Sequence, residues 1–195
     1  MDTDSARPEH LVQSVHRALE RHVRAGDVVL DATCGNGHDT LCLARQVGDT
    51  GYVHAIDVQA EAITQTRLRL QFAGSGARVA LHRANHADLS SVLPASLRGR
   101  LRVAVFNLGY RPGSDRRIVT RSETTLAALQ ACCDWLGGEG ALSVVAYPGH
   151  AAGAEEAERI GEWANDCVRR GWRATWTCPP DGRRPAPRWL WLVRR

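Results

Sequence analysis

The stretch 28–40 has the residue types and spacing of a ligand-binding turn. An apolar run ends at Asp31, Gly35 and Gly37 follow, and a helix is predicted to begin near His38. Glycine adopts positive φ and has no Cβ to keep a ligand away, and the first N–H groups of a helix are free to donate. Ligands of open α/β sheets bind beyond the carboxyl ends of the strands. We therefore expect a ligand site here; the alternative is a tight strand–helix turn that binds nothing.

The residues after this turn limit the class of ligand. A dinucleotide fingerprint has a third glycine that packs the helix against the strand, but Thr40 stands in that place. A phosphate-binding P-loop requires a lysine, and the chain contains none. An acidic strand end followed by Gly-x-Gly is also common in methyltransferases that use S-adenosylmethionine (SAM). SAM is therefore the expected cofactor, and a nicotinamide oxidoreductase is disfavoured.

Polar residues after the next two predicted strands complete a candidate nucleoside site. Asp57 ends the second strand, where an acidic residue accepts hydrogen bonds from the ribose hydroxyls of an adenosine group. Gln59 is expected to assist it. The alternative for Asp57 is an N-cap of the following helix. Asn85 and His86 follow the third strand, at the expected position of adenine, with ordinary loop polarity as the alternative.

The segment from Phe106 to Tyr110 ends the fourth predicted strand and is suited to present an amine. It resembles the Asn/Asp-Pro-Pro-Tyr/Phe motif of methyltransferases that act on amino groups of bases. The Asn107 side-chain oxygen would accept hydrogens from the amine and aim its lone pair at the methyl group. Tyr110 offers a ring on which a base can stack. The alternative is a strand-ending turn with a packed tyrosine.

Tyr147-Pro148-Gly149-His150 ends the fifth predicted strand and should lie on the same rim. Tyr147 is expected to contact the substrate. His150 is expected to position the substrate amine or to take its proton. The alternative for His150 is a cap of the next helix, and the sequence leaves the two open.

Alternating strands and helices must position these residues. The hydrophobic periodicity predicts helices over 8–24, 38–47, 59–73, 87–93, 122–136 and 153–170. It predicts strands over 27–31, 52–56, 78–82, 101–106, 141–147, 172–178 and 188–193, with Gly137–Gly140 ending the helix before the fifth strand. This order indicates an α/β fold, a doubly wound and mostly parallel sheet of seven strands. The last strand follows a loop without a helix and must be antiparallel, which is the layout of class I SAM-dependent methyltransferases (Rossmann-like).

Composition is that of an ordinary globular chain. The hydrophobic fraction is 44% and the charged fraction 24%, and no apolar run approaches the ~20 residues of a membrane span. The start of the chain is acidic and unlike a signal peptide, so a cytoplasmic location is expected. One domain is predicted over residues 1–195, with residues 1–7 disordered. The six cysteines form no C-x-x-C pair and the histidines no H-E-x-x-H, so no metal site is predicted.

All 25 basic residues are arginine, and the net charge is +4. They gather around residues 98–102, 111–121 and 183–195, and Arg116 and Arg117 stand out as candidate RNA contacts. Arginine clusters beside a cleft suit phosphate backbones. The alternatives are a solvated surface and the base composition of the genome.

Four strings of residues resemble the MnmM-type tRNA methyltransferases, a YtqB-like family formerly labelled as rRNA methylases. The strings are Asp31-Ala32-Thr33-x-Gly35-Asn36-Gly37-His38-Asp39-Thr40, Asn107-Leu108-Gly109-Tyr110-x-Pro112-Gly113-x-Asp115, Thr124-Thr125 and Tyr147-Pro148-Gly149-His150. The resemblance extends over roughly residues 10–193. His16 falls where the family tends to have a histidine in its first helix. Asp181 stands where the family usually has an asparagine, which weakens any role assigned to that loop.

The resemblance implies methylation of 5-aminomethyl-2-thiouridine to 5-methylaminomethyl-2-thiouridine at wobble position 34, with the tRNA anticodon stem-loop as partner. The expected cofactor-binding residues are Asp31, Thr33, Gly35, Asn36, Gly37, His38, Asp39, Thr40, Asp57, Gln59, Asn85, His86 and Asn107. The expected catalytic residues are Asn107, Tyr110 and His150, and the expected RNA contacts are Tyr110, Arg116, Arg117, Tyr147 and His150. No membrane association is expected, and a homodimer is left open.

Two other functions remain as alternatives. One is an rRNA or small-molecule amine methyltransferase on the same fold. The other is a non-catalytic RNA-binding module that keeps SAM as a structural ligand, which the presence of both Asn107 and Tyr110 disfavours.

Overall fold

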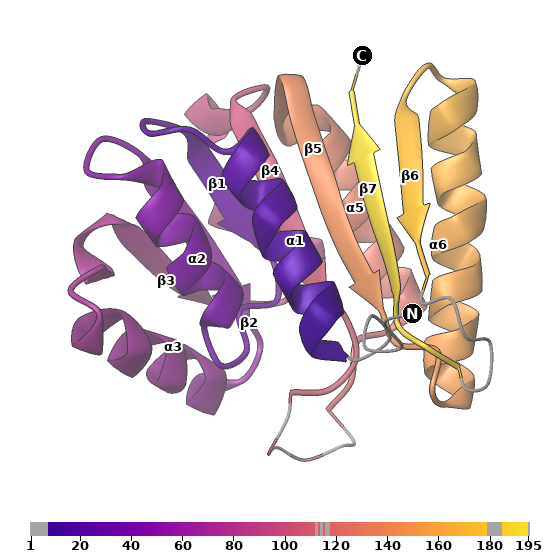
Figure 1. Ribbon diagram of the computed structural model, residues 1–195, viewed down its shortest axis with the longest axis horizontal. Helices are drawn as coiled ribbons and strands as arrows, with labels where there is room; N and C mark the ends of the chain where they lie inside the picture. Colours follow the sequence, from indigo (N-terminus) through magenta and orange to yellow (C-terminus); the bar gives the residue numbers. More distant parts are fainter. Residues whose placement is uncertain (1–7, 112, 114, 116–117, 179–184, 195) are drawn as a thin grey trace, which may run out of the picture.

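A seven-stranded sheet forms the centre of the computed structural model, which describes residues 8–111, 113, 115, 118–178 and 185–194 (Figure 1). The strands are β1 (Val28–Asp31), β2 (Tyr52–Asp57), β3 (Val79–Arg83), β4 (Leu101–Asn107), β5 (Leu136–Ala146), β6 (Arg173–Thr177) and β7 (Arg188–Val193). Their order across the sheet is β3-β2-β1-β4-β5-β7-β6, and β7 is antiparallel to both β5 and β6. The predicted sheet with a reversed last strand is confirmed.

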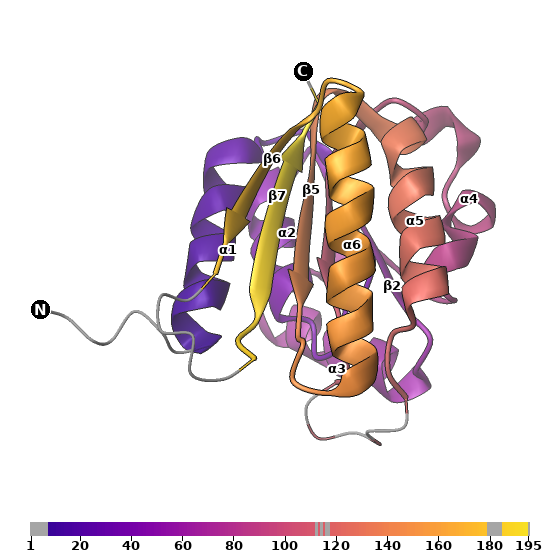
Figure 2. The ribbon, with the colours of Figure 1, turned by 90° about the vertical axis from the view of Figure 1, so that its right-hand side faces the viewer.

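Helices cover both faces of this sheet. They are α1 (Pro8–His22), α2 (His38–Val47), α3 (Ala60–Phe72), α4 (Leu89–Val92), α5 (Ser122–Trp135) and α6 (Ala151–Arg169), with 3₁₀ turns η1 (Gly76–Arg78), η2 (His86–Asp88) and η3 (Ala95–Leu97). Helices α1, α2 and α3 lie on one face, and α4, α5 and α6 lie on the other (Figure 2). None of the described helices is both long and apolar enough to cross a membrane.

Each face of the sheet has its own apolar core. Leu11, Val15, Leu19 and Val23 recur every four residues along and just beyond α1 and are buried against β1, β4 and α2, as the periodicity predicted. On the other face the largest buried side chains include Phe106 of β4 and Trp135 of α5. The two cores fix β4 between them, and β4 ends at Asn107.

The segment Gly137–Gly140 differs from the prediction. It was expected to end the helix, with the fifth strand beginning at residue 141, but β5 begins at Leu136, directly after α5. The pairing of β4 with β5 passes from Leu101–Leu136 to Val103–Ala141, so the glycine segment forms a bulge inside the strand. A Cβ on Gly140 would lie 2.7 Å from the Leu136 Cβ, so the bulge requires a residue without a side chain.

The turn between β1 and α2 depends on two glycines with positive φ. Gly35 has φ of 50° and Gly37 has φ of 79°. A Cβ on Gly37 would lie 2.9 Å from both the Cα and the hydroxyl oxygen of Thr66 in α3. Gly37 is therefore required for close packing of the turn on α3, in addition to the backbone freedom predicted from the sequence.

We expect Gly37→Ala to lower the free energy of unfolding by about 3 kcal/mol, because a left-handed alanine costs ~1–2 kcal/mol and the contact with Thr66 adds overpacking. Gly74→Ala is the matched control: its φ is 63°, and nothing lies within 4 Å of the added Cβ. The control should cost about 1 kcal/mol. Urea denaturation measures both, and equal losses would show that packing on α3 contributes nothing.

Candidate active site

Four strands deliver polar residues to one rim of the sheet, at the lower edge in Figure 1. Asp31 ends β1, Asp57 ends β2, Asn107 ends β4, and Tyr147 follows β5. These are carboxyl ends of parallel strands, where the ligand sites of such sheets lie. The predicted site residues of these four strands therefore converge.

Asp31 is completely buried beneath the turn. One carboxylate oxygen accepts a hydrogen bond from the Thr40 hydroxyl at 2.5 Å, and the other accepts from the Thr33 N–H at 3.3 Å. Burial, together with the nearby charge of Asp39, raises the pKa of Asp31 to about 7. Asp31 and Thr40 thus hold the turn in shape from below. Both side chains bond within the protein, and their expected contact with the cofactor stays a prediction.

Asp57 uses both of its oxygens on backbone N–H groups. One accepts from Gly35 at 2.9 Å, and the other accepts from Gln59 at 2.9 Å, just before α3. The N-cap of α3 is Gln59, and no side chain makes a capping bond to this helix, so the alternative that Asp57 caps it is wrong. The bond to Gly35 also ties the end of β2 to the glycine turn. A carboxylate accepts about four hydrogen bonds, so two acceptor positions remain for a ligand.

Two arginines hold Asn36, at the tip of the turn, and the sequence analysis missed both. Arg69 of α3 donates to the Asn36 carbonyl at 2.7 Å, and Arg111 donates to its side-chain oxygen at 2.9 Å. Arg111 immediately follows Tyr110, so this bond joins the glycine turn to the amine-presenting motif. Sequence separations of 33 and 75 residues left no signal for these contacts.

Asn107 lies at the centre of a hydrogen-bonded chain of side chains. Its Nδ2 donates to one oxygen of Asp39 at 3.4 Å, and the other oxygen of Asp39 bonds His16 Nε2 at 2.7 Å. The backbone N–H of Asn107 donates to the Thr33 hydroxyl at 2.7 Å. Among the described residues, no protein partner is found for the side-chain oxygen of Asn107. These hydrogen bonds therefore orient the Asn107 amide and leave its side-chain oxygen available to accept from a ligand.

The charge of His16 strengthens this chain. Its bond to Asp39, helped by Cys42, raises the pKa of His16 to about 10. His16 is thus a cation at neutral pH and forms an ion pair with Asp39 in the first turn of α2. A negative charge at that end of a helix is also favoured by the helix dipole. His38, the first residue of α2, behaves in the opposite way: burial and Arg69 lower its pKa.

A buried glutamate supports the segment after Asn107, and the sequence analysis missed this residue too. Glu156 of α6 accepts from the Thr125 hydroxyl at 2.7 Å and from the Thr120 hydroxyl at 2.8 Å. The Thr120 hydroxyl in turn accepts from the Gly109 N–H at 2.8 Å. Burial raises the pKa of Glu156. This network anchors the turn that carries Tyr110, whose side chain is exposed.

His150 caps α6. Its Nδ1 accepts a hydrogen bond from the Gly153 N–H at 3.0 Å, which confirms the capping alternative. A neutral imidazole that accepts through Nδ1 carries its proton on Nε2. It can take another proton only by giving up the cap, so a role as general base is disfavoured. Tyr147 is half-buried, and its ring would lie 3.8 Å from a Cβ on Gly109, which places it beside the motif that ends β4.

Asn85 and His86, the predicted adenine contacts, both make contacts within the protein. The Asn85 side chain accepts from the Ala87 N–H and caps η2. His86 is buried, with its ring edge against Phe106 at 5.9 Å between centroids. Burial lowers the pKa of His86 to about 4, so it is a neutral residue of the core. The sequence does not show that the His86 ring turns inward, and the adenine contact of the two residues stays a prediction.

Some predicted residues are not placed. Residues 1–7, Arg116, Arg117 and Asp181 lie outside the described residues. Within the described part of the chain, no group of three or more His, Cys, Asp or Glu side chains is arranged to hold a metal ion.

Comparison with known proteins gives a consistent picture. The chain matches the family described as "Putative rRNA methylase" over residues 53–192. It is 39% identical over 165 residues to the "tRNA (mnm(5)s(2)U34)-methyltransferase, chloroplastic" of Arabidopsis thaliana, and this match covers 80% of this chain and 60% of that protein. The chain thus spans less than two thirds of the length of that relative.

Solved structures share the architecture. The crystal structure of a "putative rRNA-methylase" from Clostridium thermocellum has a TM-score of 0.89 at 32% identity, covering 94% of this chain and 97% of that one. An rRNA methylase from Streptococcus thermophilus has a TM-score of 0.76 at 28% identity, covering 96% of each chain. A methyltransferase from Streptococcus mutans in complex with SAH has a TM-score of 0.82 at 24% identity, covering 97% of this chain and 98% of that one. The fold is that of the class I SAM-dependent methyltransferases.

The ion pair of His16 with Asp39 predicts a pH-dependent contribution to stability. The folded-state pKa of about 10 lies above the unfolded value of 6.5, so the contribution is complete below pH 6.5 and is lost as the pH rises toward 10. We expect His16→Gln to lower the free energy of unfolding by about 2 kcal/mol at pH 6, a typical value for a charged hydrogen bond, and by much less at pH 10.

His38→Gln is the control for this prediction, because its pKa shift has the opposite sign. Protonation of His38 opposes folding, so its replacement should be neutral above pH 7 and should stabilise at lower pH. Urea denaturation across the pH range measures both variants. A cost for His16→Gln that does not change with pH would show that the pair is not ionic.

Proposed function

Since the chain belongs to the family described as "Putative rRNA methylase", we propose that it is a SAM-dependent methyltransferase that acts on tRNA. The specific reaction we propose is methylation of the primary amine of 5-aminomethyl-2-thiouridine at wobble position 34, giving 5-methylaminomethyl-2-thiouridine. The name of the Arabidopsis relative supports this substrate. The observation that carries the proposal is the oriented amide of Asn107 at the end of β4.

The residues of the rim fit the cofactor. Gly37 is the N-cap of α2 and provides no side-chain cap, so a ligand can accept from the first N–H groups of the helix. We assign the methionine part of SAM to the turn from Gly35 to Gly37, and the ribose to Asp57 and Gln59. Asp31 acts beneath the turn, through its bonds to Thr40 and Thr33. When bound, SAM supplies a methyl group that is already activated for transfer.

The protein's part in the reaction is to orient and desolvate the amine. In the proposed complex the Asn107 oxygen accepts an N–H of the substrate amine, which turns the nitrogen lone pair toward the methyl group. His16 and Asp39 keep the Asn107 amide from rotating, because Nδ2 is engaged with Asp39. Holding two reactants in such geometry supplies a large share of a rate enhancement.

The amine must be neutral to attack, and its proton leaves to solvent in this proposal. His150 is not assigned as the acceptor because its Nδ1 is used to cap α6. Tyr110 is exposed beside Asn107 and is assigned to stack on the uracil ring. Tyr147 borders the same place, and Arg116 and Arg117 remain proposed contacts of the anticodon stem-loop.

Nucleoside mass spectrometry tests the function directly. The purified protein and SAM are incubated with tRNA from cells that carry 5-aminomethyl-2-thiouridine without the added methyl group. The proposal expects conversion of that nucleoside to 5-methylaminomethyl-2-thiouridine. Methylation of rRNA with the tRNA left unchanged would favour the alternative rRNA substrate and would contradict the proposal.

Asp57→Asn should weaken SAM binding by about 1–3 kcal/mol, because the amide offers one acceptor oxygen where the carboxylate offers two. Calorimetry measures the affinity. Asp49→Asn, a change at an exposed carboxylate after α2, is the control and should bind SAM normally. Unchanged SAM affinity in Asp57→Asn would show that Asp57 does not bind the cofactor and serves only through its bonds with Gly35 and Gln59.

Asn107→Ala should lower the rate of methyl transfer by ~10²-fold or more, since misplacing reacting groups by about 1 Å can cost that much. SAM affinity should change little. Tyr110→Phe is the control at the same motif and should keep most of the activity, because stacking needs only the ring. Single-turnover transfer to tRNA that carries the aminomethyl group is the measurement. A near-normal rate in Asn107→Ala would mean that this residue does not present the amine.

A further inference from the structure

A basic cavity lies at the opposite end of the sheet, where the parallel strands begin. Its volume is about 520 Å³, and one glutamate, Glu139, is its acidic lining residue. The lining arginines are Arg21, Arg24, Arg102, Arg173 and Arg194. Arg21 lies in the last turn of α1, and Arg24 lies two residues beyond this helix. Arg102 lies in β4, Arg173 begins β6, and Arg194 directly follows β7. Sequence patterns do not reveal this cluster, because its members are spread over the whole chain.

Arg102 forms the floor of the cavity, and its guanidinium group already has partners within the protein. Its side chain donates to the His22 carbonyl at 3.0 Å and to Glu139 at 3.0 Å, and Asp27 lies 3.7 Å away. Its charge is therefore balanced by the two carboxylates. The surplus positive charge of the cavity comes from the other arginines.

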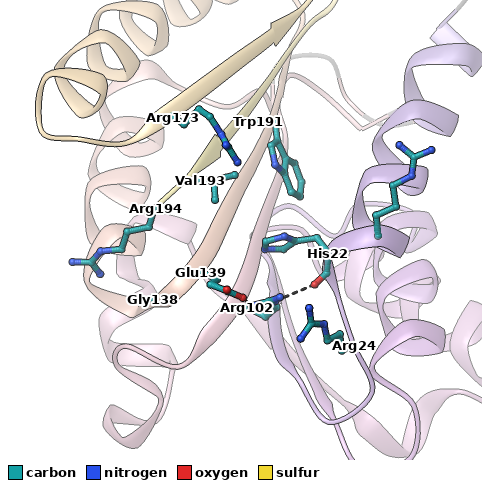
Figure 3. Close-up of a pocket in the computed structure, with 10 residues that line it drawn as sticks. His22, Arg24, Arg102, Gly138, Glu139, Arg173, Trp191, Val193 and Arg194 are labelled. Atoms are coloured by element: carbon teal, nitrogen blue, oxygen red, sulfur yellow. Dashed lines mark hydrogen bonds and ion pairs between the residues drawn. The ribbon is translucent and has the colours of Figure 1, made fainter.

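Arg24 and Arg173 approach the cavity from opposite sides, whereas Arg194 points away from it (Figure 3). Both Arg24 and Arg173 are exposed, and no hydrogen bond or ion pair of either side chain appears among the contacts of the described residues. Guanidinium groups are planar forks that match the oxygens of a phosphate. The cavity thus offers two arginines to an anion without breaking any bond of the fold.

His22 lies in the wall of the cavity. Its ring lies edge-on to Trp191, with 5.2 Å between centroids. Its Nε2 is buried and has no hydrogen-bond partner among the described residues. This ring therefore shapes the wall of the cavity, and the groups that face an anion there are the arginines. Burial and Arg102 lower the pKa of His22, and its neutral ring can still donate one N–H.

The distance to the active site indicates what kind of anion fits. Arg102 and Asn107 lie on the same strand, five residues apart, which corresponds to ~16 Å. A single nucleotide held at Asn107 cannot reach the cavity, but a polymer can. Between the two ends, the face of β6 that carries Arg173, Thr175 and Thr177 is exposed and not covered by a described helix (Figure 1).

We propose that this cavity binds phosphodiester groups of the RNA substrate, away from the nucleotide that is methylated. The inference rests on the proposed function in taking RNA as the substrate. Arg24 and Arg173 contact the phosphate oxygens, His22 lies in the wall, and Arg102 and Glu139 shape the floor. The cavity increases affinity for RNA and takes no part in the methyl transfer itself.

The test is the salt dependence of tRNA binding by the Arg24→Ala/Arg173→Ala double variant. We expect its affinity to fall about tenfold near physiological salt, and the slope of log K against log salt to become shallower by about 1.4–1.8, at ~0.7–0.9 per lost phosphate contact. The methyl-transfer rate at saturating tRNA and the affinity for SAM should not change. Filter binding and single-turnover assays give these values.

Two variants keep the test specific. Arg67→Ala/Arg78→Ala removes two exposed arginines from α3 and η1, and it should leave affinity and slope close to those of the parent. Glu139→Gln removes the acidic residue of the cavity, and it should tighten tRNA binding about threefold, because a repulsive charge is lost. A gain of affinity cannot result from misfolding.

The outcomes separate this inference from the proposed function. If the parent binds and methylates tRNA but the Arg24/Arg173 variant binds it with unchanged affinity and slope, the inference alone is overturned. A parent that does not bind tRNA overturns both. If inorganic phosphate raises the melting temperature of the parent but not of the variant, while tRNA affinity is equal in the two, the cavity is a small-anion site and the RNA assignment is wrong.

Discussion

The charge of Asp39 is the constraint on which the rim of the sheet depends. One carboxylate joins three elements that are distant in sequence: it pairs with His16 of α1, lies in the first turn of α2, and accepts from Asn107 at the end of β4. If Asp39 were neutral, His16 would lose the partner that keeps it protonated. The Asn107 amide would then be free to rotate, and its acceptor oxygen would no longer have a fixed direction.

The other carboxylates of the rim also accept hydrogen bonds from groups within the protein. Asp31 fixes the turn from below, Asp57 joins the turn to the end of β2, and Glu156 anchors the segment that follows Asn107. Each of them bonds backbone N–H groups or threonine hydroxyls, so the rim is shaped before any ligand arrives. Such preorganisation lowers the cost of binding and of reaching the reactive geometry. The rigidity of the site therefore comes from buried hydrogen-bond acceptors. Ligands are recognised by the few polar atoms that have no partner within the protein.

Sequence patterns predicted the elements well, because strands and helices follow the apolar periodicity that the two cores require. They failed where a contact joins distant residues or where a side chain turns inward. Nothing local shows that Glu156 meets Thr120, or that Arg111 reaches Asn36. The glycine segment 137–140 was placed before the fifth strand, since glycine is rare in strands, but it forms a bulge inside β5. The cap made by His150 was one of two open alternatives, and only the bond to Gly153 decides between them.

Strand β4 links the two ends of the molecule. It carries Arg102 at its beginning and Asn107 at its end, and it is hydrogen-bonded to β1 on one side and β5 on the other. A strand paired on both sides cannot stretch or slide without breaking its ladder. The distance between the basic cavity and the amine-presenting residue is thus fixed by the sheet itself. On our proposals, an RNA that engages both ends must match this distance, so the sheet would select substrates by shape as well as by the chemistry of one base.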